Sequence, residues 1–378
     1  MNNQDPWGPF EQVMKAPLEW AGTWKKKTSG CVIGHLLPDV PEEIIHAASA
    51  LPTALEGAGV GISRARAHIP SYTCNHASGV VELGLQGALA VLDAVVIPYV
   101  CDTTRNLGHV WNRLFPALPS EFLRLPKRLD FPSARDYLHA EYTRLTESLA
   151  RITGHKASEN DLQAAVNLYN SSRAQLRHAF LKHREAPRVW TASRLFLLTA
   201  SALRCPREDH LEWMKALPWD AKPDHSDNPP VPIYVKGKVW DPPQIFRILD
   251  ELGFVVAGDE TVTGFRSVAV DAPDREDPVA ALVDRHFAMI PYVGYHIDPG
   301  RTITGLVDRA RESGAAGVVY LNPKFCEAAA FDVPDGRKAL ENAGTPCLVL
   351  ETSSGSSSEG QVRLRLEAFR EMISSELL

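Results

Sequence analysis

Residues 71–111 read SYTCNHASGVVELGLQGALAVLDAVVIPYVCDTTRNLGHVW, and this stretch decides the fold. Its continuous apolar run at 94–97 ends at Pro98, which predicts a strand buried on both faces. Cys101 and Asp102 follow directly, and Thr103 or Thr104 can cap the next helix. Cys74 lies in a short loop ahead of a helical pattern. Because ligands bind beyond the carboxyl ends of the strands in open α/β sheets, Cys101 lies at a predicted ligand-binding edge.

The same arrangement recurs far downstream, where the apolar run at 317–321 predicts another strand and Cys326 and Glu327 follow it. Three convergent thiolates are enough to hold a metal cluster, and a [4Fe–4S] cube on three cysteines leaves one iron open to water or substrate. The alternative is that each cysteine is a small buried apolar residue. Zinc on Cys74, Cys101, Cys326 and His76 is a further alternative, but the chain has no short paired spacing of the C-x₂-C kind. The pattern of the three cysteines favours a cluster.

Three polar residues beside the cysteines are candidates for chemistry. Asp102 and Glu327 directly follow two of them and can orient a ligand or move a proton, or they can simply stabilise the N-termini of the helices that follow. His76 can support a substrate pocket or be an ordinary polar loop residue. We therefore treat His76, Asp102 and Glu327 as candidate catalytic residues.

Composition excludes several classes of protein. A net charge of −6 over 378 residues provides no basic field, so nucleic acid is not an expected partner. No apolar run reaches the roughly 18 residues needed to cross a bilayer, and the start MNNQDPWGPF has no signal-peptide pattern. We expect a cytoplasmic protein, with no membrane partner, whose six cysteines stay reduced.

The order of predicted elements indicates an α/β protein. We expect an N-terminal arm at 1–27, a first α/β lobe at 28–133, a helical segment at 134–225 and a second α/β lobe at 226–378. In the first lobe, residues 31–34 predict a strand, and Pro41 opens a helix that we expect to continue through the small residues 47–55. Residues 115–132 read as proline-rich connections. A capping-box pattern at 158–161 starts a long helix.

The C-terminal segment carries a possible anion site. A Ser/Gly loop at 351–360 precedes a predicted helix at 361–372, so Ser354, Arg363 and Arg365 can hold a phosphate group of a bound cofactor or substrate. A flexible surface loop is the alternative. The chain has no Walker motif, no G-x-G-x-x-G, no H-E-x-x-H and no nucleophile elbow, so nucleotide and hydrolase chemistry have no support.

Seven segments occur in an order that resembles one family: PEEIIHAASALP (41–52), SYTC (71–74), ELGLQGAL…CDTTRNLGHVW (82–111), GDETVTGFR (258–266), Asp277-Pro278, GVVYLNPKFC (317–326) and the pattern Q.R.R.EAF.EM (361–372). Together they resemble the benzoyl-CoA reductase / 2-hydroxyacyl-CoA dehydratase family along almost the whole chain. The resemblance implies two Rossmann-like parallel-sheet lobes with a helical segment between them. It also implies a [4Fe–4S] cluster at the lobe interface, held by Cys74, Cys101 and Cys326.

The resemblance further implies partners. These are a related cluster-bearing subunit, a separate ATP-hydrolysing iron–sulfur component that supplies low-potential electrons, and a CoA-thioester substrate. Many dehydratase subunits have an aromatic-Cys pair after the first strand, where this chain has Leu36-Leu37. That difference, the segment RNLGHVW (105–111) and the length of the chain make it look more like the smaller of the cluster-bearing subunits of ATP-dependent benzoyl-CoA reductase. The alternatives are a subunit of a 2-hydroxyacyl-CoA dehydratase and a non-catalytic electron relay.

Overall fold

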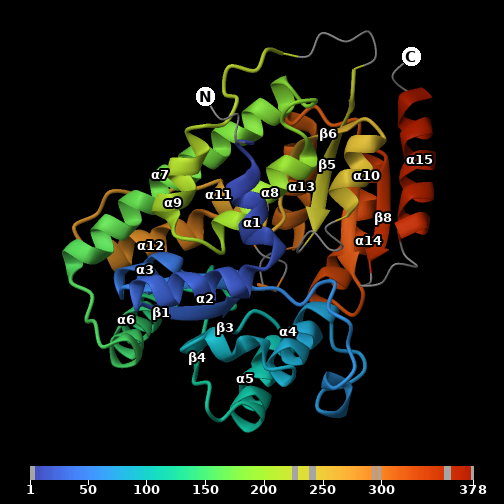
Figure 1. Ribbon diagram of the computed structural model, residues 1–378. Coiled ribbons are helices and arrows are strands. Elements are labelled where there is room, and N and C mark those ends of the chain that lie inside the picture. Colours follow the sequence, from blue (N-terminus) through green and yellow to red (C-terminus); the bar gives the residue numbers. More distant parts are fainter. Residues whose placement is uncertain are drawn as a thin grey trace.

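The protein is described from a computed structural model that covers residues 5–223, 229–237, 244–291, 294–295, 299–352 and 359–375, without the side chains of 299–301. Two four-stranded parallel sheets form two lobes, as predicted (Figure 1). The strands of the first sheet are β1 (Cys31–Leu36), β2 (Ala50–Leu55), β3 (Ala94–Pro98) and β4 (Ser120–Leu123). Those of the second are β5 (Val231–Gly237), β6 (Phe254–Asp259), β7 (Gly317–Pro323) and β8 (Cys347–Thr352).

The two sheets have the same topology. The strand orders are β2-β1-β3-β4 and β6-β5-β7-β8. In each sheet the second strand in chain order lies at one edge beside the first, and the third and fourth strands lie on the other side of the first. In such a sheet the strand order reverses between the first and third strands, and ligands bind outside the carboxyl ends of the strands at that switch point. The equivalent positions are therefore the ends of β1 and β3 in one lobe and of β5 and β7 in the other.

One predicted element is wrong. The helix expected to run to residue 55 stops early, because α3 spans only Glu42–Ala47 and Ser49 adopts a left-handed φ of 58°. Residues 50–55 instead pair in parallel with β1 as the edge strand β2, where Ile33 faces Pro52. An edge strand tolerates proline because one side of it needs no backbone donor. The proline-rich connections at 115–132 also contain the short edge strand β4, which was not predicted from the sequence.

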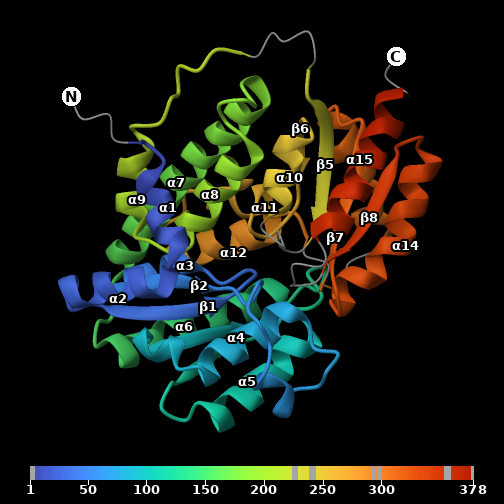
Figure 2. The ribbon, with the colours of Figure 1, turned by 45° about the vertical axis from the view of Figure 1, so that its right-hand side comes forward.

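Helices cover both sheets and fill the space between them (Figures 1 and 2). Those of the N-terminal half are α1 (Gly8–Lys15), α2 (Pro17–Thr28), α4 (Asn75–Leu85), α5 (Asp102–Leu114), α6 (Ala134–Thr153), α7 (Glu159–Glu185), α8 (Ala192–Ala202) and α9 (Arg207–Met214). Those of the C-terminal half are α10 (Ile245–Glu251), α11 (Phe265–Val268), α12 (Pro278–Ala288), α13 (Pro299–Glu312), α14 (Glu327–Asn342) and α15 (Glu359–Ser375). Short 3₁₀ turns occupy Ala65–Ala67 and Ala88–Val91. No described helix is long and apolar enough to cross a membrane.

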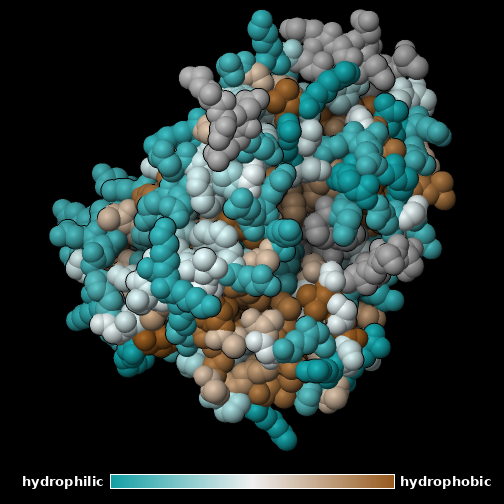
Figure 3. Space-filling view, in the orientation of Figure 1, coloured by the Kyte–Doolittle hydropathy of each residue, from teal (hydrophilic) through white to brown (hydrophobic). Residues whose placement is uncertain are grey.

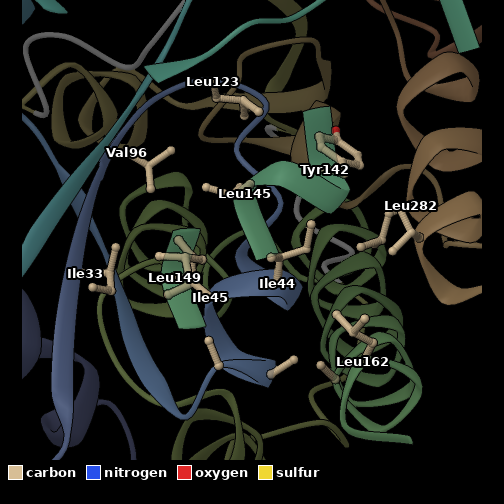
Figure 4. Packing of buried hydrophobic residues seen from close by; sticks show 14 of the residues in the cluster. Ile33, Ile44, Ile45, Val96, Leu123, Tyr142, Leu145, Leu149, Leu162 and Leu282 are labelled. Carbon is tan, nitrogen blue, oxygen red and sulfur yellow. The ribbon is translucent and has the colours of Figure 1, made fainter. Parts of the chain in front are cut away.

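The largest core joins segments that are far apart in the sequence. Ile33 and Val96 of the first sheet pack with Leu145 of α6, Leu162 of α7 and Leu282 of α12 (Figure 4). The helix α12 comes from the predicted second lobe, so this core crosses the predicted border at 226. The boundaries of the four segments stay predictions, but helices α6 and α7 between the sheets pack on the first lobe.

Three buried ion pairs tie the segment after β1 to three other elements. They are Asp39–Arg266 at 2.6 Å, Glu42–Arg207 at 2.6 Å and Glu43–Arg173 at 2.7 Å. Burial raises the pKa of Asp39, but the charge and hydrogen bonds of Arg266 outweigh burial and lower it to about 2. The three arginines come from α11, α9 and α7, so these pairs fix the first lobe against both the helical segment and the second half of the chain.

Candidate metal-cluster site

Each of the three predicted ligands is the N-cap residue of a helix. Cys74 precedes α4, Cys101 precedes α5 and Cys326 precedes α14. The carbonyl oxygen of each accepts the first hydrogen bond of its helix, from the N–H of Ser78, Arg105 and Ala330, at 3.0, 3.1 and 2.9 Å. The N-terminus of a helix carries free N–H groups and partial positive charge, so a thiolate or an anionic cluster is stabilised there.

Cys101 and Cys326 occupy the same place in the two lobes. Cys101 follows β3 and Cys326 follows β7, the third strand of each sheet, beside the point at which the strand order reverses. Cys31 and Cys347, in contrast, are the first residues of β1 and β8. They therefore lie at the amino-terminal ends of the strands, away from the carboxyl ends that Cys101 and Cys326 follow. The buried Cys205 donates from its Sγ to the carbonyl oxygen of Ser201 near the end of α8, so it packs in the core.

One pocket of ≈120 Å³ joins the three cysteine segments. Its lining includes Thr73 beside Cys74, Asp102 beside Cys101, and Glu327 beside Cys326, although none of the three cysteines itself lines it. Figure 2 shows the start of α14 directed toward the lobe that carries α4 and α5. Cys74 and Cys326 are buried, at 5% and 6% exposure, whereas Cys101 is partly exposed. The structure thus brings the three segments to one pocket, and the role of the three cysteines as cluster ligands stays a prediction.

Hydrogen bonds and backbone conformation fix the positions of Cys101 and Cys326. The Thr104 hydroxyl accepts from the N–H groups of Val100 and Cys101, each at 3.2 Å, and donates to the Cys101 carbonyl oxygen at 3.0 Å. The N-cap itself is therefore Cys101 and not a threonine as expected, while Thr104, the third residue of α5, bonds back to it as in a capping box. Before Cys326, Phe325 adopts a left-handed φ of 64°, which turns the chain from β7 into α14.

Two glycines, Gly57 and Gly79, allow the helix that follows Cys74 to pack closely against the loop after β2. A Cβ atom on Gly79 of α4 would lie 2.1 Å from the carbonyl oxygen of Gly57, and one on Gly57 would lie 2.2 Å from the carbonyl oxygen of His76. The loop after β2 therefore touches the first turns of α4 backbone to backbone, which only glycine permits.

The remaining candidates are in different places. Asp102 and Glu327 are the first residues of α5 and α14 and line the pocket, so both the helix-capping and the chemical interpretation remain open. The His76 side chain is buried and does not line this pocket. Arg363 forms an ion pair with Glu251, and Arg365 donates to the carbonyl oxygen of Val349. Ser354 lies outside the described residues. The predicted phosphate site therefore stays a prediction.

One charged residue near this site, Lys127, was not predicted from the sequence. Its Nζ lies 4.4 Å from the centre of the Tyr99 ring and 3.4 Å from the carbonyl oxygen of Gly294. Burial lowers the pKa of Lys127 to about 8, against the opposing effect of Cys101 and Asp102. The sequence offered no signal for it, because the contact with Gly294 joins positions 167 residues apart.

A second charged residue that was not predicted, Asp259, lies within the segment GDETVTGFR. Asp259, at the end of β6, accepts hydrogen bonds from the N–H groups of Thr261 and Phe265 at 2.9 and 3.0 Å. Burial raises its pKa to about 7, so this carboxyl group can exchange a proton near neutral pH. Its neighbour Glu260 is held by Lys236 and Arg309.

Comparison with known proteins agrees with the resemblance found in the sequence. The family model described as 2-hydroxyglutaryl-CoA dehydratase, D-component, matches residues 39–373. The chain belongs to this family. Among its relatives are the (R)-phenyllactyl-CoA dehydratase beta subunit of Clostridium sporogenes, 22% identical over 99% of this chain and 100% of the relative, and the beta subunit of lactoyl-CoA dehydratase of Anaerotignum propionicum, 26% identical over 96% and 97%. A benzoyl-CoA reductase subunit of Thauera aromatica is 27% identical over 83% of each chain.

Membership of the 2-hydroxyglutaryl-CoA dehydratase D-component family does not itself place a cluster in this chain. Whether the three cysteines fit one is therefore tested on their positions. In the described part of the chain, no group of three or more His, Cys, Asp or Glu side chains is arranged to hold a single metal ion. A cube differs from a single ion because each cysteine bonds to a different iron, so its three sulfur atoms need not converge on one point. Three cysteines at helix N-termini, each next to a residue that lines one pocket, fit such a group, whereas a Cys₃His zinc site would need its ligands to converge on one ion.

Proposed function

We propose that this chain is the iron–sulfur subunit of an ATP-dependent benzoyl-CoA reductase, which removes the aromaticity of an aromatic acyl-CoA by low-potential single-electron transfer. The observation that supports it best is the placement of the three cysteines. Each is a helix N-cap, two stand at equivalent positions of two lobes with the same topology, and residues beside all three line one pocket.

In this proposal Cys74, Cys101 and Cys326 hold a [4Fe–4S] cluster, which would supply single electrons at low potential. The N–H groups at the starts of α4, α5 and α14 stabilise negative charge in the pocket. Asp102 and Glu327 line the pocket and can hold or pass a proton. Lys127 adds a positive charge beside Cys101 that offsets part of the negative charge of the site.

A dehydratase subunit is the second candidate, and the comparisons favour it in one respect. The two dehydratase relatives align over 96% and 99% of this chain, whereas the reductase relative aligns over 83%. Dehydration of a 2-hydroxyacyl-CoA releases water with no net change in electrons, whereas reduction of an aromatic ring takes up an electron pair and two protons.

Electron counting separates the two candidates. The complete complex would be given a limiting amount of reductant and ATP with benzoyl-CoA or with a 2-hydroxyacyl-CoA. The reductase predicts that product from benzoyl-CoA rises in proportion to electrons supplied. Many turnovers of a 2-hydroxyacyl-CoA for each electron supplied would instead identify a dehydratase.

The third candidate, an electron relay whose partner holds the substrate, needs a separate comparison. If this subunit takes part in chemistry, Asp102→Asn lowers turnover while the iron content and the assembly stay unchanged. A relay predicts that Asp102→Asn turns over normally whereas Cys326→Ser does not.

A further inference from the structure

A small pocket of ≈70 Å³ lies where the first lobe meets the helices between the sheets. It is lined by the segment after β1 and by residues of α7, α9, α11 and α12, which gather above the first sheet (Figures 1 and 2). It shares no lining residue with the cysteine pocket. One water molecule needs roughly 10–15 Å³, so a pocket of this size can hold a small ion but not a CoA thioester. We call it the junction pocket.

The charges that line the junction pocket do not balance. Three carboxylates and four arginines line it. Each carboxylate belongs to one of the three buried ion pairs described above, which use three of the arginines. The fourth, Arg285, forms no ion pair with any described residue, and its Nε and Nη2 donate to the carbonyl oxygens of Val270 and Ser267 at 3.0 and 2.7 Å. The lining therefore carries one positive charge more than negative.

Neighbouring titratable groups do not remove this excess. Burial raises the pKa of Tyr169 well above its usual range, so its hydroxyl stays uncharged. Burial lowers the pKa of His286 to about 4, so this imidazole is neutral at neutral pH. Asp271, beside Arg173, is balanced by its own closer partner Arg177 at 2.6 Å. The positive charge of Arg285 thus has no counter-charge of its own among the described residues.

Polar atoms around the pocket also lack partners. Nε of Arg173, Nε of Arg207 and Nδ1 of His35 are buried and have no hydrogen-bond partner in the structure. On the face that Figure 3 presents, hydrophilic side chains cover much of the surface over α7 and α9, as is usual for exposed charge. Arg173 and Arg207 of these helices are instead only 5% and 6% exposed. Unbalanced buried charge and unpaired buried donors both cost free energy, and a bound anion would lower that cost.

We propose that the junction pocket binds a small monovalent anion, of which chloride is the simplest, and that this ion balances the charge of Arg285. A single negative charge matches the single excess positive charge, whereas sulfate or a phosphate dianion would leave the lining negative. Because the pocket exists only where the first lobe and the helices meet, a bound ion stabilises that arrangement over the unfolded chain. The site is separate from the cysteines, so the inference does not depend on the proposed function.

The first test measures stability against chloride concentration. Urea unfolding of the full chain would be followed at constant ionic strength, with chloride replacing gluconate, which is too large for the pocket. For a site with a Kd of about 20 mM or below, raising chloride from about 20 to about 200 mM should lower the unfolding equilibrium constant of the wild type about five- to tenfold. In Arg285→Met the change should stay below about twofold, because the excess charge is gone. Arg275→Met is the matched control, since Arg275 is an exposed arginine paired with Asp284 of α12, and it should respond like the wild type.

The second test locates the ion in the wild type, so it decides even if Arg285→Met does not fold. Crystals of the wild type would be soaked in sodium bromide and anomalous scattering recorded at the bromine edge. An anomalous peak in the junction pocket beside Arg285 is expected. Ordered water there without a bromide peak, or an equal chloride effect in the wild type and Arg285→Met, overturns the inference. Neither readout involves iron or turnover, so a chain without a cluster overturns the proposed function and leaves the anion site in place.

Discussion

Replacing Gly79 by alanine tests how the first turns of α4 are held. A Cβ atom at position 79 would lie 2.1, 2.5 and 2.6 Å from the carbonyl oxygen, Cα and carbonyl carbon of Gly57, whereas ordinary contacts begin near 3.4 Å. The two backbones must therefore separate by about 1 Å. Overpacking of this kind costs about 1–3 kcal/mol, and alanine in a helix interior returns about 0.5–1 kcal/mol. We expect Gly79→Ala to lower the free energy of unfolding by about 1–2 kcal/mol.

Urea unfolding at 25 °C measures this loss of stability. The reactivity of the Cys74 thiol shows whether α4 has shifted. Because α4 begins just after Cys74, which is 5% exposed, a shifted helix should raise the rate at which iodoacetamide alkylates that thiol in the metal-free chain. Gly61→Ala is the matched control, since a Cβ at Gly61 meets nothing within 4 Å, and its stability should stay within about 0.5 kcal/mol. A Gly79→Ala protein as stable as the wild type, with unchanged alkylation, would refute the reasoning.

Three further predictions follow from the contacts. Asp39→Asn should cost about 3 kcal/mol at neutral pH, because it leaves the Arg266 charge buried without its partner, as urea unfolding would measure. Because the pKa of Asp39 is lowered to about 2, its contribution of about 2 kcal/mol to stability is fully present above pH 4 and is lost as the pH falls toward 2. The free energy of unfolding of the wild type should therefore fall more steeply between pH 4 and pH 2 than that of Asp39→Asn. Parallel curves of stability against pH would contradict this. Thr104→Val should cost about 1–3 kcal/mol by stranding the N–H groups of Val100 and Cys101, whereas Thr104→Ser should retain most of the stability; equal losses would show that the hydroxyl is not what matters.

Patterns within one element allowed most of this fold to be predicted. The apolar runs at 94–97 and 317–321 became β3 and β7, and the capping box at Ser158 opens α7 with an Asp161 N–H donating to the Ser158 hydroxyl at 3.2 Å. The cysteines after these strands were found for the same reason, because a strand end fixes which edge of the sheet the next residues occupy.

Elements decided by pairing with distant segments could not be predicted. Residues 50–55 read ALPTAL; Pro52 already argued against a helix interior there, but only pairing with β1 shows that the segment is a strand. The strand order, the backbone contact between Gly57 and Gly79, and the approach of Lys127 to Gly294 likewise depend on positions brought together by folding. None of these leaves a periodic signal in the local sequence.

Metal analysis tests most directly whether the three N-cap cysteines hold an iron–sulfur cluster. Iron, zinc and acid-labile sulfide would be measured in the assembled complex purified without oxygen, for the wild type, Cys326→Ser and Cys347→Ser. Cys347 is the matched control, because it is the first residue of β8 and lies at the amino-terminal end of a strand in the same sheet, away from the carboxyl end that Cys326 follows. We expect about four iron and four sulfide per site in the wild type and in Cys347→Ser, and a clear loss in Cys326→Ser. Zinc in place of iron, or iron that is retained in full by Cys326→Ser, would contradict the proposed cluster.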